Sequence, residues 1–221
     1  MPLPSIEIET APNPRHAVIW LHGLGADGRD FEPIVPELVD ASWPPVRFVF
    51  PNAPVRPITI NGGMAMRAWY DISGLEIAQR QDEAGIRESI RLLGELIERE
   101  VARGVPSANI LVAGFSQGGA IVISGGVRYA SRLGGIIALS TYLPLQEITA
   151  AESSGANVST PIFMAHGSSD PVVPQALGSA SRDALAALGH AVDWHSYPMA
   201  HQVCAQEVAD LRAWIGERLA A

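Results

Sequence analysis

The sequence predicts an α/β fold in which a mostly parallel sheet carries helices on both faces. Strand-like and helix-like segments alternate along the whole chain, which is typical of parallel strands joined by crossover helices. Several strand-like segments are nearly continuous apolar runs, as expected for strands buried on both faces. The chain has 221 residues, 48% of them hydrophobic, enough for one well-packed domain. Because no internal repeat or linker interrupts this pattern, we expect a single domain over residues 1–221.

Seven segments are expected to form strands. The first alternates apolar and polar residues like an edge strand, the next five are short apolar runs, and the last alternates again. In chain order these strands are Ser5–Glu9, Ala17–Leu21, Val46–Phe50, Asn109–Ala113, Gly135–Leu139, Pro161–Ala165 and Ala191–Tyr197.

Five segments have helical periodicity. The clearest runs from Asp82 to Arg103, where one apolar stripe faces pairs of Glu and Arg residues on the opposite side. That stripe consists of Ile86, Ile90, Leu93 and Ile97. The other expected helices are Phe31–Val39, Gly118–Tyr129, Gln175–Leu188 and Val203–Leu219.

Two connections depart from the regular spacing. The segment Pro51–Leu75 is too long and too rich in Met and Trp for a simple connector, and long ordered loops are often functional. The segment Ser140–Thr160 is about 20 residues long, which leaves no room for a separate lid domain.

Composition excludes several classes of function. All 15 basic residues are arginine, so there is no Schiff-base lysine and no P-loop lysine. A net charge of −8 disfavours binding to nucleic acid or to an anionic lipid surface. No apolar run approaches the roughly 18 residues of a membrane helix, so we expect no stable membrane insertion. The one cysteine, Cys204, and the lack of a secretory signal predict a cytoplasmic protein.

A serine lies on a sharp turn in the middle of the chain. Residues 114–118 read G-F-S-Q-G, directly after an expected strand and before a helix of small residues. The G-x-S-x-G pattern needs this strand–turn–helix setting, because glycines flank a nucleophile whose backbone is strained. The pattern is short enough to arise by chance, so this context carries the argument. We predict that Ser116 is a catalytic nucleophile at a helix N-terminus.

Such a serine requires a base and an acid that orients the base. In this strand–turn–helix architecture they follow in the order acid and then histidine, each on a loop after a strand. Asp170 follows the strand that ends at Ala165, and His201 follows the strand that ends at Tyr197. We therefore predict Asp170 and His201 as the partners of Ser116.

The other candidate residues fit less well. Asp193 and His195 share one face within a strand, and Asp71 precedes Ser116 in the chain. The remaining histidines are best interpreted as a structural hydrogen-bonding residue at a strand end (His166), a solvated turn residue (His190) and a residue without an acidic neighbour (His16). Cys204 favours a small apolar role over a nucleophilic one. We expect no metal site, since there is no Cys pair and no His-Glu-x-x-His motif.

The loop H-G-L-G-A-D-G, residues 22–28, contains a G-x-G-x-x-G pattern after a strand. A dinucleotide site would need an acidic residue at the end of the next strand, where the sequence is Phe50-Pro51-Asn52. A serine hydrolase instead needs a second backbone N–H here for the oxyanion of its tetrahedral intermediate. We predict that Leu24 and Gln117 donate those two N–H groups, and that no cofactor is bound.

These motifs resemble the α/β-hydrolase family of small bacterial carboxylesterases and acyl-protein thioesterases, also called the phospholipase/carboxylesterase family. The similar stretches are WLHGLGADG, RFVFPNAPVRPITINGGMAMRAWYDI, GFSQGG, LSTYLP, HGSSDPVVP and YPMAHQV, in the family's order and along nearly the whole chain. The resemblance implies an α/β-hydrolase fold without a separate lid domain, the triad above and the same oxyanion hole. One departure is Ala200, where the family often has glycine before the histidine, which bears on substrate preference.

The resemblance also indicates where substrate binds. In the family, the loop that here holds Met64, Met66, Trp69 and Tyr70 lines or covers the groove, although these residues could equally fill the core. Tyr142 and Leu143 are expected to border the pocket.

The predicted activity is hydrolysis of carboxylic esters with short to medium acyl chains through an acyl-enzyme on Ser116. An acyl-protein thioesterase or lysophospholipase for long acyl chains is the alternative, and a non-catalytic binding protein on the same fold is a further one. The expected partner is a small ester or thioester, with a homodimer left open.

Overall fold

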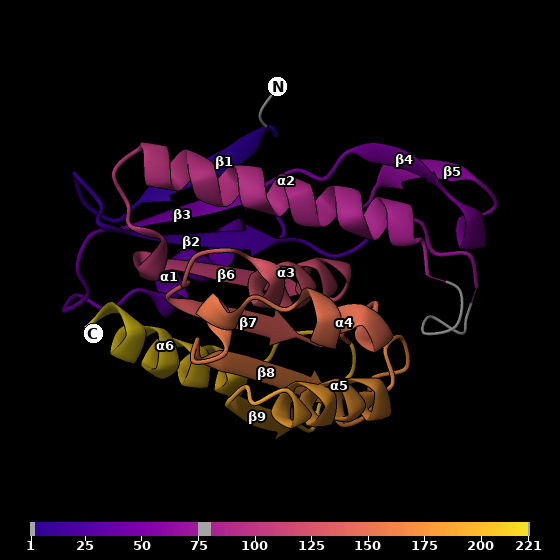
Figure 1. Cartoon of the computed structure of the whole chain (residues 1–221). Helices are drawn as coiled ribbons and strands as arrows, with labels where there is room; N and C mark the ends of the chain where they lie inside the picture. Colours follow the sequence, from indigo (N-terminus) through magenta and orange to yellow (C-terminus); the bar gives the residue numbers. More distant parts are fainter. Residues whose placement is uncertain (1–2, 75–80, 221) are drawn as a thin grey trace.

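The computed structural model describes residues 3–74 and 81–220, in which seven strands form one sheet (Figure 1). The spatial order is β1-β3-β2-β6-β7-β8-β9; β1 pairs antiparallel to β3, and all other neighbours are parallel. The predicted mostly parallel sheet is therefore confirmed. Its strands are β1 (Ser5–Glu9), β2 (His16–Leu21), β3 (Val46–Pro51), β6 (Ile110–Phe115), β7 (Gly135–Leu139), β8 (Ile162–Gly167) and β9 (Val192–Tyr197).

Four of the five predicted helices are present in the structure. The described helices are α1 (Val35–Leu38), α2 (Glu83–Ala102), α3 (Gln117–Arg128), α4 (Gln146–Glu152), α5 (Gln175–Ala187) and α6 (Ala205–Leu219). The expected helix over 31–39 is wrong in extent, because it splits into a 3-10 turn and the single α-turn α1. Pro33 and Pro36 supply no N–H to a helical ladder, which keeps these turns short.

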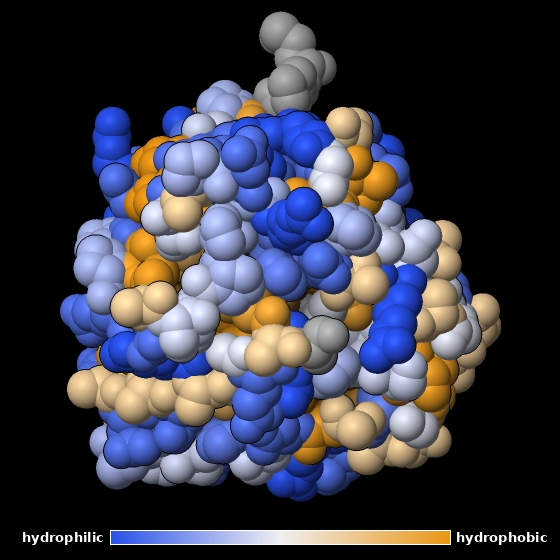
Figure 2. Space-filling view, turned by 90° about the vertical axis from the view of Figure 1, so that its left-hand side faces the viewer, coloured by the Kyte–Doolittle hydropathy of each residue, from blue (hydrophilic) through white to orange (hydrophobic). Residues whose placement is uncertain are grey.

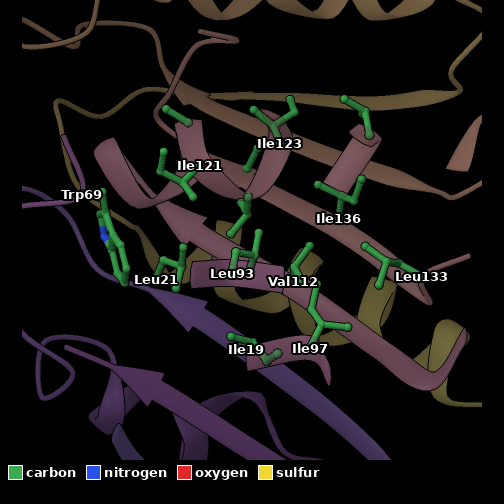
Figure 3. Packing of buried hydrophobic residues seen from close by; sticks show 14 of the residues in the cluster. Ile19, Leu21, Trp69, Leu93, Ile97, Val112, Ile121, Ile123, Leu133 and Ile136 are labelled. Carbon is green, nitrogen blue, oxygen red and sulfur yellow. The ribbon is translucent and has the colours of Figure 1, made fainter. Parts of the chain in front are cut away.

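The strands divide the core into two layers because successive side chains point to opposite faces. On β2, Ile19 and Leu21 face the layer under α2 and α3, whereas Val18 and Trp20 face the layer under α1 and α6. Figure 3 shows the first layer, in which Ile121 of α3 and Leu93 of α2 pack on the sheet. Alternate burial on both faces explains the continuous apolar runs of the sequence.

The two long connections contain structure that the sequence analysis did not predict. Residues 51–74 include the antiparallel hairpin of β4 (Val55–Ile58) and β5 (Met64–Arg67), which lies beyond the carboxyl ends of the parallel strands (Figure 1). Leu75, the last residue of the predicted loop, lies outside the described residues. The segment 140–160 carries α4. Four-residue strands and a helix of two turns give too little periodicity to stand out in one sequence.

The strand order places a crevice between β2 and β6. The chain leaves β2 for β3 on one side and then returns to β6 on the other. In open parallel sheets, ligands bind at such a switch point, outside the carboxyl ends of the strands. Figure 2 shows the opposite end of the molecule, where hydrophobic residues lie scattered among hydrophilic ones. Among the described residues, no helix is long and apolar enough to cross a membrane.

His190 and Glu207 have surroundings that the sequence does not predict. His190 is buried, with 4% of its surface exposed, so its prediction as a solvated turn residue is wrong. The turn that holds it folds back on α5, where the His190 N–H donates to Leu185 O at 3.1 Å. Glu207 in the first turn of α6 is fully buried. Burial raises the pKa of Glu207 to about 8, although the Cys204 N–H opposes the shift, and the Asp210 carboxylate raises it further.

We expect Glu207 to destabilise the fold as the pH rises from about 5 to about 8, because over this range the unfolded chain releases a proton that the folded chain retains. Glu207→Gln should remove this pH dependence and stabilise the protein at pH 8 by on the order of 2 kcal/mol. Thermal unfolding of both proteins between pH 5 and pH 8 measures this difference. Parallel stability curves for parent and variant over that range would contradict it.

Candidate active site

Ser116 lies at the turn from β6 into α3 with a strained backbone. Its φ is +54° and its ψ is −119°, a region that non-glycine residues rarely adopt. A Cβ on Gly114 would collide with the backbone of Gly118, and a Cβ on Gly118 would collide with the carbonyl oxygen of Leu21. The two glycines of the motif are therefore a steric requirement of this turn. As a result the Ser116 side chain stands at the edge of the sheet, beside the first N–H groups of α3.

The structure brings Ser116, His201 and Asp170 together in one hydrogen-bonded chain. His201 Nε2 lies 2.9 Å from Ser116 Oγ, and His201 Nδ1 lies 2.7 Å from Asp170 Oδ2. The His201 ring also packs against Phe115, with 4.8 Å between ring centroids. This arrangement can transfer the serine proton to an imidazole whose orientation a carboxylate holds, which is the geometry of nucleophilic catalysis.

Asp170 is positioned by its own turn. Its side chain is fully buried, and Oδ1 accepts hydrogen bonds from the backbone N–H groups of Val172 and Val173 at 2.8 and 2.9 Å. The neighbouring His166 lies at the end of β8, where its Nε2 donates to Val173 O at 2.8 Å. The interpretation of His166 as a structural hydrogen-bonding residue is confirmed. Burial lowers the pKa of His166, which favours the neutral ring beside Asp170.

The glycine loop after β2 lies against Ser116. A Cβ on Gly23 would be 3.6 Å from Ser116 Cβ, so the backbone here runs close to the nucleophile. The His22 side chain stabilises the loop with two hydrogen bonds. Its Nε2 accepts from the Ala53 N–H at 3.1 Å, which leaves Nδ1 to donate to Gly23 O at 2.7 Å. Gly28, the third glycine of the pattern, packs against the Phe50 carbonyl, where a Cβ would clash. Close packing against the end of β3 therefore accounts for this third glycine.

Two backbone N–H groups remain available at this edge. Within the described residues, neither the Leu24 N–H nor the Gln117 N–H donates to a backbone or side-chain acceptor. Both residues line the same cavity as Ser116 and His201. Two unpaired donors beside a nucleophile can stabilise an oxyanion as it forms.

The Gln117 side chain is a functional feature that the sequence analysis missed. Its Oε1 accepts from the Trp69 N–H at 2.8 Å, and its Nε2 donates to Tyr70 O at 2.7 Å. Trp69 in turn donates its indole N–H to His22 O at 2.9 Å, and its own carbonyl accepts a hydrogen bond from Ser89. Hydrogen bonds thereby join the segment after β5 both to the loop that contains Leu24 and to the turn that contains Gln117. No pattern in one sequence reports such side-chain contacts between distant segments.

The candidate catalytic residues Ser116 and His201 open onto a cavity of about 280 Å³ with a largely apolar lining. Its described lining consists of Gly23, Leu24, Ala26, Asp30, Tyr70, Ile72, Phe115, Ser116, Gln117, Tyr142, Val172, Val173 and His201. An apolar pocket of this kind suits an acyl chain whose carbonyl lies at Ser116.

The predicted substrate-binding residues divide into two groups. Tyr142 lines the cavity, as does Tyr70. Met64, Met66, Trp69 and Leu143 are not among its described lining residues. Met64 is exposed on the hairpin, Met66 packs near Gly25, and Trp69 is fully buried in the core. Of the two roles left open for Trp69, the structure favours core packing, because Trp69 is fully buried in the cluster that contains Leu21 and Ile121, beside which it lies in Figure 3.

The remaining candidates lie outside the site. Asp193 and His195 pair with each other on β9, with 3.0 Å between Oδ1 and Nε2. Asp71 accepts hydrogen bonds from Thr59, and Cys204 is the partly buried residue that precedes α6. Within residues 3–74 and 81–220, no group of three His, Cys, Asp or Glu side chains is arranged to hold a metal ion.

Comparison with known proteins points to one family. A family model described as Phospholipase/Carboxylesterase matches residues 4–218. The chain is 36% identical to acyl-protein thioesterase 1 of Yarrowia lipolytica, over 99% of this chain and 98% of the relative. It is 40% identical to acyl-protein thioesterase 1 of Neurospora crassa, over 91% and 86%. The sequence analysis stressed bacterial carboxylesterases, whereas these relatives are fungal thioesterases.

Solved structures agree with this family and fold. The crystal structure of SOBER1 of Arabidopsis thaliana superimposes with a TM-score of 0.88 at 31% identity, over 93% of this chain and 99% of that one. Zea mays acyl-protein thioesterase 2 gives a TM-score of 0.82 at 25% identity, over 97% and 99%.

We expect the hydrogen bond from Asp170 to His201 to activate Ser116 toward a fluorophosphonate probe. Asp170→Asn should slow labelling of Ser116 by about a thousandfold or more, since the amide favours the wrong imidazole tautomer. Mass spectrometry of the labelled peptide over time measures the rate. Asp193→Asn, which alters a His–Asp pair on β9, is the matched control and should label like the parent; equal labelling of both variants would contradict the role of Asp170.

We expect Trp69→Phe to slow catalysis although Trp69 does not line the cavity. The substitution removes the indole N–H that donates a hydrogen bond to His22 O. A displaced Leu24 N–H should lower kcat by about tenfold, less than the loss of the donor itself, with little change in KM. Steady-state kinetics on a chromogenic ester, with Trp194→Phe as control, checks this split. A change in KM alone would show that Trp69 contributes to binding instead.

Proposed function

Because the chain belongs to the phospholipase/carboxylesterase family, we propose that it is an acyl-protein thioesterase that works through an acyl-enzyme on Ser116. Its general class follows from the comparisons: it is a serine hydrolase that cleaves ester-type bonds. The choice of thioester is supported by relatives of nearly the same length that are named acyl-protein thioesterase 1. The single cysteine supports a reducing compartment such as the cytoplasm for this activity.

The observation that carries the proposal is the chain from Ser116 through His201 to Asp170, at an apolar cavity with two unpaired N–H donors. A serine hydroxyl is a weak nucleophile at its ordinary pKa and requires such a base. The donors from Leu24 and Gln117 suit the negative charge that develops on a carbonyl oxygen.

The reaction has two halves. In the first, His201 takes the Ser116 proton as Oγ attacks the thioester carbonyl, and the resulting oxyanion accepts hydrogen bonds from Leu24 and Gln117. The C–S bond then breaks, and the imidazolium gives its proton to the departing thiolate. In the second half, His201 deprotonates a water that attacks the acyl-enzyme, the bond between the acyl carbon and Ser116 Oγ breaks, and the imidazolium returns the proton to Oγ. Asp170 holds the imidazole tautomer throughout, and the products are a carboxylic acid and a free thiol.

The short-to-medium carboxylesterase that the sequence analysis favoured is the second candidate. The comparisons support the thioesterase better, since the curated relatives bear that name. The volume of the cavity at Ser116 favours the shorter acyl chains, because about 280 Å³ lies just below the usual range for ligand pockets. The preference for a sulfur or an oxygen leaving atom and the preferred length of the acyl chain are therefore best tested in separate experiments.

We expect the protein to release free thiol from a peptide with an S-acylated cysteine faster than it cleaves the same peptide with an O-acylated serine. Ser116→Ala should lower kcat/KM on both by more than about a thousandfold, and Ser168→Ala, an exposed serine of the Asp170 loop, should retain activity. Faster cleavage of the oxygen ester would favour the carboxylesterase. Near-parent activity of Ser116→Ala would refute both functions.

A further inference from the structure

Tyr142 borders a second cavity as well as the catalytic one. The second cavity measures about 270 Å³ and lies between α4 and α5. Its described lining consists of Gln81, Tyr142, Leu143, Gln146, Glu147, Leu177, Ala180 and Ser181. Tyr142 is the residue that the two described linings share. Tyr142 therefore forms part of the wall between the cavity that holds Ser116 and the second cavity.

A hydrogen bond between two tyrosines closes this wall. The hydroxyl oxygens of Tyr70 and Tyr142 are 2.9 Å apart, and both side chains are buried. Burial raises the pKa of Tyr142 to about 12 and that of Tyr70 well above its ordinary value. Both hydroxyls are therefore neutral at physiological pH, and one ordinary hydrogen bond joins them.

The backbones on both sides of the wall are anchored. Gln117 holds the Tyr70 carbonyl at 2.7 Å, and Ser181 Oγ accepts the Leu143 N–H at 2.8 Å. Thr141 donates its hydroxyl to Ser116 O at 2.7 Å. Because the neighbouring peptide groups are tied down, the wall can open only by rotation of the tyrosine side chains. Opening it need not disturb the catalytic residues.

The second cavity suits the end of an acyl chain. Leu143, Leu177 and Ala180 give the second cavity an apolar side, and its polar lining residues are Gln81, Gln146, Glu147 and Ser181. The catalytic cavity alone is small for a long acyl chain. A tail that passed Tyr142 would find additional apolar surface there.

We propose that the Tyr70–Tyr142 pair is a gate that sets acyl-chain length. While it is closed, the enzyme takes short and medium chains; when the side chains part, the second cavity receives the tail of a long chain. This inference rests on the proposed function, because it concerns the acyl group that Ser116 attacks. It assigns Leu143, a predicted substrate-binding residue, to the second cavity.

The test compares kcat/KM for butanoyl, octanoyl and hexadecanoyl thioesters with the same thiol leaving group. Tyr70→Phe and Tyr142→Phe each remove one hydroxyl, and with it the hydrogen bond between the two side chains, with little change in volume. Each should raise the hexadecanoyl-to-butanoyl ratio by roughly three- to tenfold, the equilibrium value of one neutral hydrogen bond. The double variant should match the single ones, since both changes delete the same bond.

A control and a blocking variant complete the test. Tyr129→Phe loses a hydroxyl bonded to Glu98 at the other end of α3 and should keep the parent ratio. Ala180→Phe, at an exposed position that lines the second cavity, should lower hexadecanoyl turnover while butanoyl turnover stays at the parent value. The gate would be overturned if Tyr70→Phe and Tyr142→Phe both kept the parent hexadecanoyl-to-butanoyl ratio, or if Ala180→Phe kept the parent hexadecanoyl turnover. Neither result would contradict thioester cleavage. If the parent protein cleaved none of the three thioesters, the proposed function itself would be refuted.

Discussion

The contact between the turn at Ser116 and the loop after β2 is the constraint on which the site depends. Gly114 lets the turn fold back onto Gly118, and Gly118 lets the start of α3 pack against the carbonyl oxygen of Leu21. Ser116, between them, has a positive φ. A non-glycine residue in that conformation costs about 1–3 kcal/mol, which the packed sheet around β2 and β6 must offset. In return, one backbone arrangement exposes the hydroxyl, turns the Gln117 N–H outward and brings the Leu24 N–H alongside.

The segment after β5 makes this arrangement rigid. Gln117 uses its backbone for the candidate oxyanion hole and its side chain to bind Trp69 and Tyr70, while Trp69 binds the loop of Leu24 through His22. The same segment supplies Tyr70 to the cavity wall. The candidate oxyanion hole and the proposed gate are thus built from neighbouring residues of one segment.

Local sequence sufficed for the parts of the molecule that local chemistry determines. Apolar runs predicted five of the seven strands, and alternation of apolar and polar residues predicted the other two. The carboxyl ends of the parallel strands lead into all five residues proposed for catalysis, since parallel strands bring these ends to one edge. Long-range packing was not predictable. Trp69 could be assigned to core or pocket, His190 seemed solvated after Gly189, and the short β4–β5 hairpin with its prolines lacked a strand-like period. In each case the deciding neighbour is distant in the chain.

The most direct test of the central claim is a crystal structure of the protein after reaction with an alkyl phosphonate. The tetrahedral phosphorus stands in for the acyl carbon under attack, and its phosphoryl oxygen stands in for the oxyanion. We predict phosphorus bonded to Ser116 Oγ, with that oxygen about 3 Å from the backbone nitrogens of both Leu24 and Gln117. An adduct on another residue, or a phosphoryl oxygen that points away from those two nitrogens, would contradict the account.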